Sequence, residues 1–168
     1  MNRFVSKYRF IVFMLIEIEI MITKKDLMEL SDKRFKDSQV LLNNSRYNGA
    51  VYLAGYVIEL SLKLNVCKFF KLERGYPEVR KDLDLYDSEI KNKFLNASRN
   101  VGLRTFKTHN LEDLLLISGK EPEVLDLYPY QRAQLTDWTP KIRYLNQNIR
   151  KKEAESFLTS VSKIKTIL

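Results

Sequence analysis

The sequence predicts an all-α protein: an up-and-down bundle of four main helices with extra short helices. The chain has only 5 Gly and 4 Pro in 168 residues, and sandwiches or barrels of many short strands need more turn residues than that. Apolar residues recur at the spacing of a helix face along most of the chain. With 45% hydrophobic and 30% charged residues, the chain can bury a core, which excludes disordered and low-complexity classes.

Residues 1–20 differ from the rest of the sequence and form an N-terminal extension, before a single helical domain over residues 21–168. The uninterrupted apolar run, Phe10 to Ile16, is too short for a transmembrane helix, which needs about 20 apolar residues. Three interpretations stay open. The extension is a secretory signal, although acidic residues follow the run and no small-residue cleavage site appears; it is a strand of alternating residues; or the reading frame is over-extended and starts naturally at Met21.

The first helix is predicted from Thr23 to about Ser45. Thr23 can cap its start, and Asp26 lies near the positive end of the helix dipole. The run Asn43-Asn44-Ser45 breaks the pattern, because these side chains compete for backbone hydrogen bonds.

The second helix, Tyr47 to Phe70, is the most hydrophobic. Glu59 and Lys63 are spaced i,i+4, in the orientation that best supports an ion pair on a helix. Their neighbours are apolar, so we interpret them as a buried structural pair. Small residues along this helix permit close packing inside the bundle or across a two-fold axis: Gly49, Ala50, Ala54 and Gly55.

The rest of the chain is predicted as one loop followed by helical segments. These are a loop over residues 71–86; a helix capped by Asp87, reaching about Asn100 and followed by Gly102; a short helix over residues 109–116; a helix opened by Glu121 that can extend to Leu135; and a last helix from Lys152 to Leu168.

The formal net charge is +8, from 29 Lys and Arg against 21 Asp and Glu. This excess is either a solvated basic surface or a means of contact with polyanions. Cys67 is the single cysteine and His109 the single histidine, which excludes a disulfide framework and argues against a zinc site. We therefore expect no metal and no cofactor, a reducing cytoplasmic location and no membrane attachment.

Three separate stretches carry a family resemblance. Residues 47–63, with the pattern Ala-Gly-Tyr-x-x-Glu-x-x-x-Lys, residues 108–111, which read Thr-His-Asn-Leu, and Trp138 with Arg143-Tyr144 resemble the HEPN domain family (higher eukaryotes and prokaryotes nucleotide-binding). The resemblance covers about residues 23 to 168. It implies a bundle of four main helices, commonly a homodimer, found beside nucleotidyltransferases or in toxin–antitoxin, CRISPR and antiviral systems. Many members are metal-independent endoribonucleases with an Arg-x4-6-His motif, and others serve as binding or scaffold modules.

Arg104 and His109 fit the spacing of that motif. Metal-independent RNA cleavage requires a base for the 2′-hydroxyl and a cation for the phosphorane. Thr105 stands where active members often carry Asn, Asp or His, and His109 falls at the start of a helix rather than inside one. Three roles for His109 are therefore weighed: a structural group at the helix N-terminus, which is favoured, a catalytic base, or a ligand contact.

Basic residues gather between the third helix and His109. Together with Phe106, they can form a strip for phosphate contact and base stacking, or a basic loop rim without function. The binding candidates are Arg99, Phe106 and Lys107, to which the family resemblance adds Arg143 and Tyr144.

These observations favour a HEPN-like module that binds a nucleotide, RNA or a nucleotidyltransferase-type partner, and that works as a homodimer. The first alternative is a toxin-like, metal-independent endoribonuclease using Arg104 and His109. The second is a bundle whose only role is dimerisation.

Overall fold

The computed structural model describes residues 21–144 and 148–168, and within these ranges the regular structure is helical, without strands. The four main helices are α2 (Lys24–Asn43), α3 (Tyr47–Phe69), α4 (Ser88–Val101) and α8 (Lys151–Lys165). Shorter elements join α4 to its neighbours and to α8: η1 (Arg80–Leu85), α5 (Leu111–Ile117), α6 (Glu121–Leu127), α7 (Pro129–Thr136) and η2 (Pro140–Tyr144). The predicted all-α bundle is confirmed. The interpretations of residues 1–20 lie outside the described residues.

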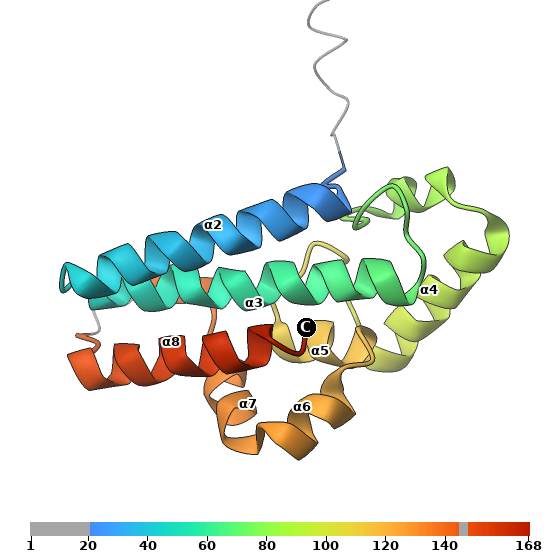
Figure 1. Cartoon of the computed structure of the whole chain (residues 1–168). Helices are drawn as coiled ribbons and strands as arrows, with labels where there is room; N and C mark the ends of the chain where they lie inside the picture. Colours follow the sequence, from blue (N-terminus) through green and yellow to red (C-terminus); the bar gives the residue numbers. More distant parts are fainter. Residues whose placement is uncertain (1–20, 145–147) are drawn as a thin grey trace, which may run out of the picture.

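Helix α3 is the centre of the bundle, and α2 packs antiparallel along it (Figure 1). Small polar side chains of α2 face α3 and let the two helices lie close together. The Ser31 hydroxyl is 2.9 Å from that of Ser61 and 3.2 Å from the carbonyl oxygen of Val57. These contacts satisfy buried hydroxyl groups that would otherwise destabilise the core.

Helix α8 runs parallel to α3 (Figure 1) and also contacts α2, where Lys165 Nζ lies 2.7 Å from Asp32 Oδ1. Just before α8, the Ile149 amide donates to Asn48 near the start of α3, at 3.0 Å. At the other end, the Asn65 side-chain amide donates to the carbonyl oxygen of Leu168. The parallel direction requires a long connection, residues 70–150, and this connection carries the remaining helices.

The helix ends follow from local sequence. Thr23 and Asp26 form a reciprocal capping box at the start of α2. Asp87 caps α4 by accepting from the Ile90 amide at 2.8 Å, and Gly102, with φ of +75°, ends it in the left-handed conformation. These three predicted helix ends are confirmed.

Several predicted boundaries differ from the structure. The segment predicted as a loop over residues 71–86 contains η1, and the helix that opens at Glu121 stops at Leu127. Pro129 cannot donate a backbone hydrogen bond and starts a separate helix, α7, instead of continuing α6. The last helix spans Lys151–Lys165 rather than Lys152 to Leu168.

Helix α3 is long and apolar enough to cross a membrane by length and composition alone. Most of its apolar window, 78%, is buried inside the bundle, as in the core helix of any folded bundle. Its small residues lie inside too. Ala50 and Ala54 are fully buried. Gly55 lies against Trp138, and a Cβ atom at this position would be 1.9 Å from Cε2 of the indole.

Candidate functional site

The buried charges of the candidate site lie on α3. Lys63 Nζ is 2.9 Å from Glu59 Oε1, and the two side chains are 5% and 3% exposed. Their i,i+4 spacing places both on one face of the helix. A buried pair of this kind needs further polar partners to offset the loss of hydration, and both residues have them.

His109 is the second partner of Glu59. Its Nδ1 lies 2.9 Å from Glu59 Oε2, and its side chain is 46% exposed. Because a carboxylate only accepts hydrogen bonds, Nδ1 carries the proton in this contact. Nε2 is then the ring nitrogen that can accept a proton, which is the arrangement of a histidine oriented by a carboxylate.

The structure does not use the His109 ring as the cap of α5, and the wider structural role expected of His109 stays a prediction. The next residue, Asn110, caps α5 through its side-chain oxygen, which accepts from the amides of Glu112 at 2.9 Å and Asp113 at 3.4 Å. His109 lies one position earlier and is held by α3 instead. It therefore ties the segment before α5 to the central helix.

Aromatic rings surround the histidine. Tyr56, one turn before Glu59, contacts His109 and Trp138 edge to face, with ring centroids 6.1 Å and 5.2 Å apart. Burial raises the pKa of the Tyr56 hydroxyl, and a hydrogen bond with Tyr52 adds to this rise, so the group stays protonated. Trp138 is only 4% exposed and lies against Gly55.

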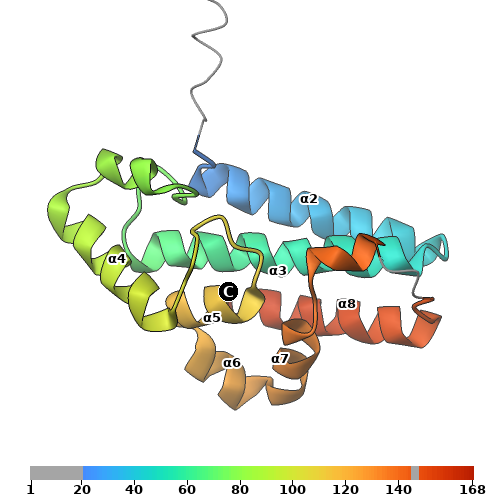
Figure 2. The ribbon, with the colours of Figure 1, turned by 180° about the vertical axis from the view of Figure 1, so that it is seen from behind.

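A hollow opens beside the histidine, and we call it the His109 hollow. η2, which contacts α3 (Figure 2), lines it together with the residues just before and after Trp138. Its lining includes Asn110, Thr136, Thr139, Pro140 and Lys141.

Glu78 extends the buried charges toward the surface. Its Oε1 lies 3.8 Å from Lys63 Nζ, and its Oε2 lies 3.5 Å from Lys107 Nζ. Lys63 also lies over the ring of Tyr76, 5.2 Å from its centroid. Burial raises the pKa of the Tyr76 hydroxyl, which donates to the Phe106 carbonyl oxygen at 3.0 Å.

A second hollow, the arginine hollow, lies between the start of η1, the C-terminal half of α4 and residues 103–106. Three arginines line it: Arg80, Arg99 and Arg104. In the described part of the chain, none of them forms an ion pair, and Arg99 donates to Asn96 at 3.4 Å. The apolar part of the lining comes from Val79, Leu95, Leu103 and Phe106.

The residues predicted from the sequence as site candidates therefore do not form one site. Arg99, Arg104 and Phe106 line the arginine hollow. His109 lines the other hollow, so the fold does not gather Arg104 and His109 around one cavity. Lys107 lines neither of these hollows and pairs with Glu78.

Arg143 and Tyr144 form a third group, on the first half of α3. Arg143 donates to the Tyr52 hydroxyl at 3.0 Å and lies over the Tyr144 ring, 4.6 Å from its centroid. Hydrogen bonds with Tyr56 and then Arg143 lower the pKa of Tyr52, against the effect of its burial. The Tyr144 ring is 75% exposed, as a stacking surface requires.

Three charged lining residues were missed by sequence reasoning: Glu78, Arg80 and Lys141. The first two fall in a stretch predicted as a loop, and loop residues have no periodicity that assigns them a face. Lys141 differs from other surface lysines only by its place in η2.

Metal and thiol chemistry find no support in the described residues, where no group of three His, Cys, Asp or Glu side chains can hold a metal ion. Cys67 is buried, and burial raises the pKa of its thiol to about 12. No protein-family model, no curated protein and no solved structure matches the chain.

Proposed function

We propose that the chain is a HEPN-like binding module for RNA or a nucleotide, working in the cytoplasm with a nucleotidyltransferase-type or defence-system partner. The observation that carries the proposal is the arginine hollow, lined by apolar side chains and by three arginines that form no ion pair in the described part of the chain. Guanidinium groups bind phosphate oxygens through paired hydrogen bonds. Phe106 adds an aromatic ring of the kind on which bases stack.

The charge of the whole chain acts in the same direction. A net charge of +8 attracts a polyanion at long range, and this attraction weakens as salt rises. Selective binding therefore has to be distinguished from general attraction, and a charge-matched control does so.

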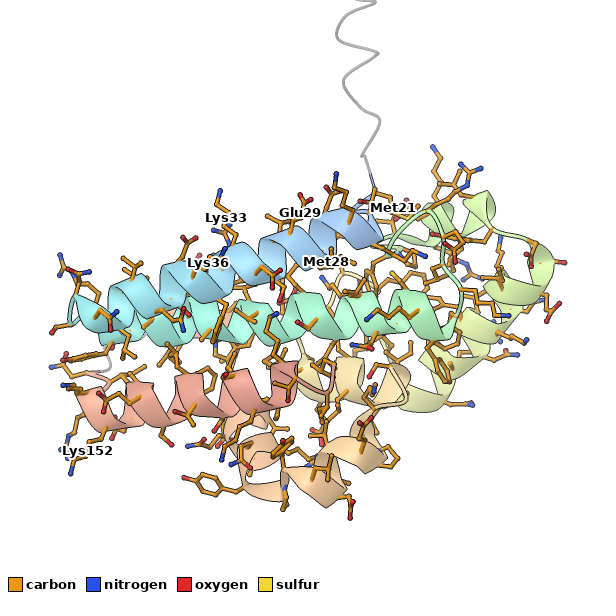
Figure 3. The ribbon with its side chains drawn as sticks, in the orientation of Figure 1. Met21, Met28, Glu29, Lys33, Lys36 and Lys152 are labelled. Atoms are coloured by element: carbon orange, nitrogen blue, oxygen red, sulfur yellow. The ribbon has the colours of Figure 1, made fainter. Side chains whose placement is uncertain are left out.

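The test compares two double variants with the same loss of charge. Arg99→Gln with Arg104→Gln removes cations of the arginine hollow. Lys33→Gln with Lys36→Gln removes two exposed cations of α2, outside that hollow (Figure 3). We expect the first variant to weaken binding of single-stranded RNA by at least about tenfold, from roughly 1.5–3 kcal/mol of lost phosphate contacts, and the second to change it far less. Equal losses, measured by fluorescence anisotropy, would mean that the hollow is not the site.

One observation favours the alternative, a metal-independent endoribonuclease. Glu59 orients His109 so that Nε2 can accept a proton, as a general base requires. Arg104, however, lines the other hollow, so a single copy offers no cation beside the histidine from this motif. We expect no EDTA-resistant RNA cleavage by the wild type. Cleavage that disappears in both His109→Ala and Arg104→Ala would establish the alternative.

The proposal includes a homodimer. Because Ala50, Ala54 and Gly55 are buried inside the bundle, we expect the dimer interface on another surface. Sedimentation at tens of micromolar (~10⁻⁵ M) detects a dimer of ordinary affinity. A monomer at that concentration would contradict the dimer, and a dimer that binds no RNA would favour a purely structural dimerisation bundle.

A further inference from the structure

We propose that the arginine hollow selects nucleoside monophosphates through Glu78, whose carboxylate accepts a pair of hydrogen bonds from the ribose or the base. The inference rests on the proposed function and assigns a ligand class to the same hollow. Its basis is the position of a single acid among three arginines.

Glu78 is the one carboxylate among the described residues that line the arginine hollow. In a surface with no binding role, an acid among arginines would pair with one of them. Its cationic partners are instead Lys63 and Lys107, neither of which lines the hollow. The three arginines form no ion pair with Glu78 and can contact an anion, so the lining combines three cations with one acid.

Both the backbone and the side chain of Glu78 have contacts that hold the residue in place. The amides of Glu78 and Val79 donate to Asp82 at 2.8 Å and 3.0 Å, which fixes the backbone at the start of η1. The Glu78 side chain contacts Lys63, which is itself buried and paired with Glu59. A group that is already oriented loses little conformational freedom when a ligand binds.

The oxygens of Glu78 keep capacity for a ligand. Their distances to the two lysine nitrogens, 3.8 Å and 3.5 Å, exceed the range of about 2.7–3.2 Å for a good hydrogen bond. Each carboxylate oxygen has two lone pairs, so a pair of donors on a ligand can still be accepted.

The ligand that fits has an anionic group, an apolar body and two neighbouring donors. Nucleoside monophosphates meet this description in two ways, because the ribose carries adjacent hydroxyl groups and guanine carries adjacent N–H groups on its pairing edge. The shared chemistry is a donor pair facing a carboxylate. A free phosphate has the anionic charge without the apolar body that carries the ribose or base donors, and Glu78 repels its charge.

The experiment titrates the full chain with 5′-GMP, 5′-AMP, their 2′-deoxy forms and inorganic phosphate, by calorimetry. We expect a preference of about tenfold, the scale of a hydrogen bond to a charged group, either for ribose over deoxyribose or for guanine over adenine. Glu78→Gln should remove that preference and at the same time strengthen the binding of inorganic phosphate. Structural damage cannot produce these opposite changes.

Three results would overturn the inference: equal affinity for all four nucleotides, a preference that survives Glu78→Gln, or no nucleotide binding. If RNA still binds through Arg99 and Arg104 in these cases, the proposed function stands and only the role of Glu78 is rejected. If neither RNA nor nucleotides bind, both are rejected. Should Glu78→Gln lower the melting temperature, the titrations of both proteins are made at a temperature where the variant is folded.

Discussion

Gly55 shows how one missing side chain shapes the candidate site. The indole of Trp138 occupies the space that a Cβ atom would fill, and the same indole lines the His109 hollow. Trp138 also contacts Tyr56, which contacts His109. The position of this ring therefore depends on glycine in the middle of α3, where glycine otherwise lowers helix stability.

We expect Gly55→Ala to destabilise the protein. The new methyl group would lie 1.9 Å from Cε2 and 2.1 Å from Nε1 of a buried, rigid ring, and overpacking of this kind costs about 1–3 kcal/mol. Gly49→Ala is the matched control, because its Cβ would meet the flexible end of Leu41 at 3.2 Å and helix propensity gains about 1 kcal/mol. Urea denaturation measures both, and equal stability of the two variants would contradict this account.

At the same scale, sequence reasoning identified residues better than roles. Glu59 and Lys63 were interpreted as a buried pair from their spacing, and the structure pairs them at 2.9 Å. The third member, His109, is 50 residues away in sequence from Glu59, and no local pattern predicts such a contact. Its neighbour Asn110 has the better chemistry for a cap, which is why Asn110 rather than His109 caps α5.

The start of α2 gives an element-scale prediction with a pH dependence. Hydrogen bonds from the Thr23 hydroxyl and then the Thr23 amide lower the pKa of Asp26. A carboxyl group with a lowered pKa stabilises the fold above its unfolded pKa of about 3.9, and this stabilisation is lost as the pH falls through the folded value.

We expect Thr23→Ala to lower the free energy of unfolding at pH 7 by about 1 kcal/mol, the usual effect of a lost cap. The difference in unfolding free energy from the wild type should shrink below about pH 4, because a protonated Asp26 no longer gains stability from the Thr23 hydrogen bonds that favour its charged form. Thr23→Ser retains the hydroxyl and serves as the control. A difference that stays constant from pH 7 to pH 3, in thermal melts, would show that Asp26 plays no part.

Element boundaries were predictable where the chain itself provides the signal. Caps at Thr23 and Asp87 and a left-handed Gly102 follow from local hydrogen bonding and backbone freedom. η1 was not predictable, because its short helix has too few turns to show a period. Missing η1 also meant missing two charged residues of the arginine hollow, because Glu78 and Arg80 lie at the start of η1 and line that hollow.

For the whole molecule, the described fold predicts where truncation becomes harmful. We expect deletion of residues 1–20 to leave the melting temperature unchanged. Deletion of residues 1–23 also removes the Ile22 carbonyl oxygen, which accepts from the Tyr76 amide at 3.1 Å, and the Thr23 cap. The longer deletion should cost about 1–3 kcal/mol in stability.

Thermal melts of the two truncated chains and the full chain decide this prediction. A large loss for the shorter deletion would mean that residues 1–20 contribute to the core, as a strand or helix would. Equal melting temperatures for all three chains would show that the contacts of Ile22 and Thr23 contribute little.

At this scale the sequence also indicated that basic residues gather near α4, but it did not indicate which of them lie together in the folded protein. Arg99, Arg104 and Phe106 meet at one hollow because α4 and the segment after it fold back on each other. Arg143 lies on the first half of α3 instead. Which of several basic segments come together depends on tertiary packing, and composition alone does not determine it.

The parallel direction of α3 and α8 has a consequence for how the chain folds. α2 and α3 are joined by a short turn, so their contacts form between residues close in sequence. α8 can cover α3 only after the long connection over residues 70–150 has closed, and contacts between distant residues slow folding. During synthesis the most apolar helix of the protein leaves the ribosome well before the helix that covers it. In that interval α3 is the surface on which a chaperone or a neighbouring nascent chain would act.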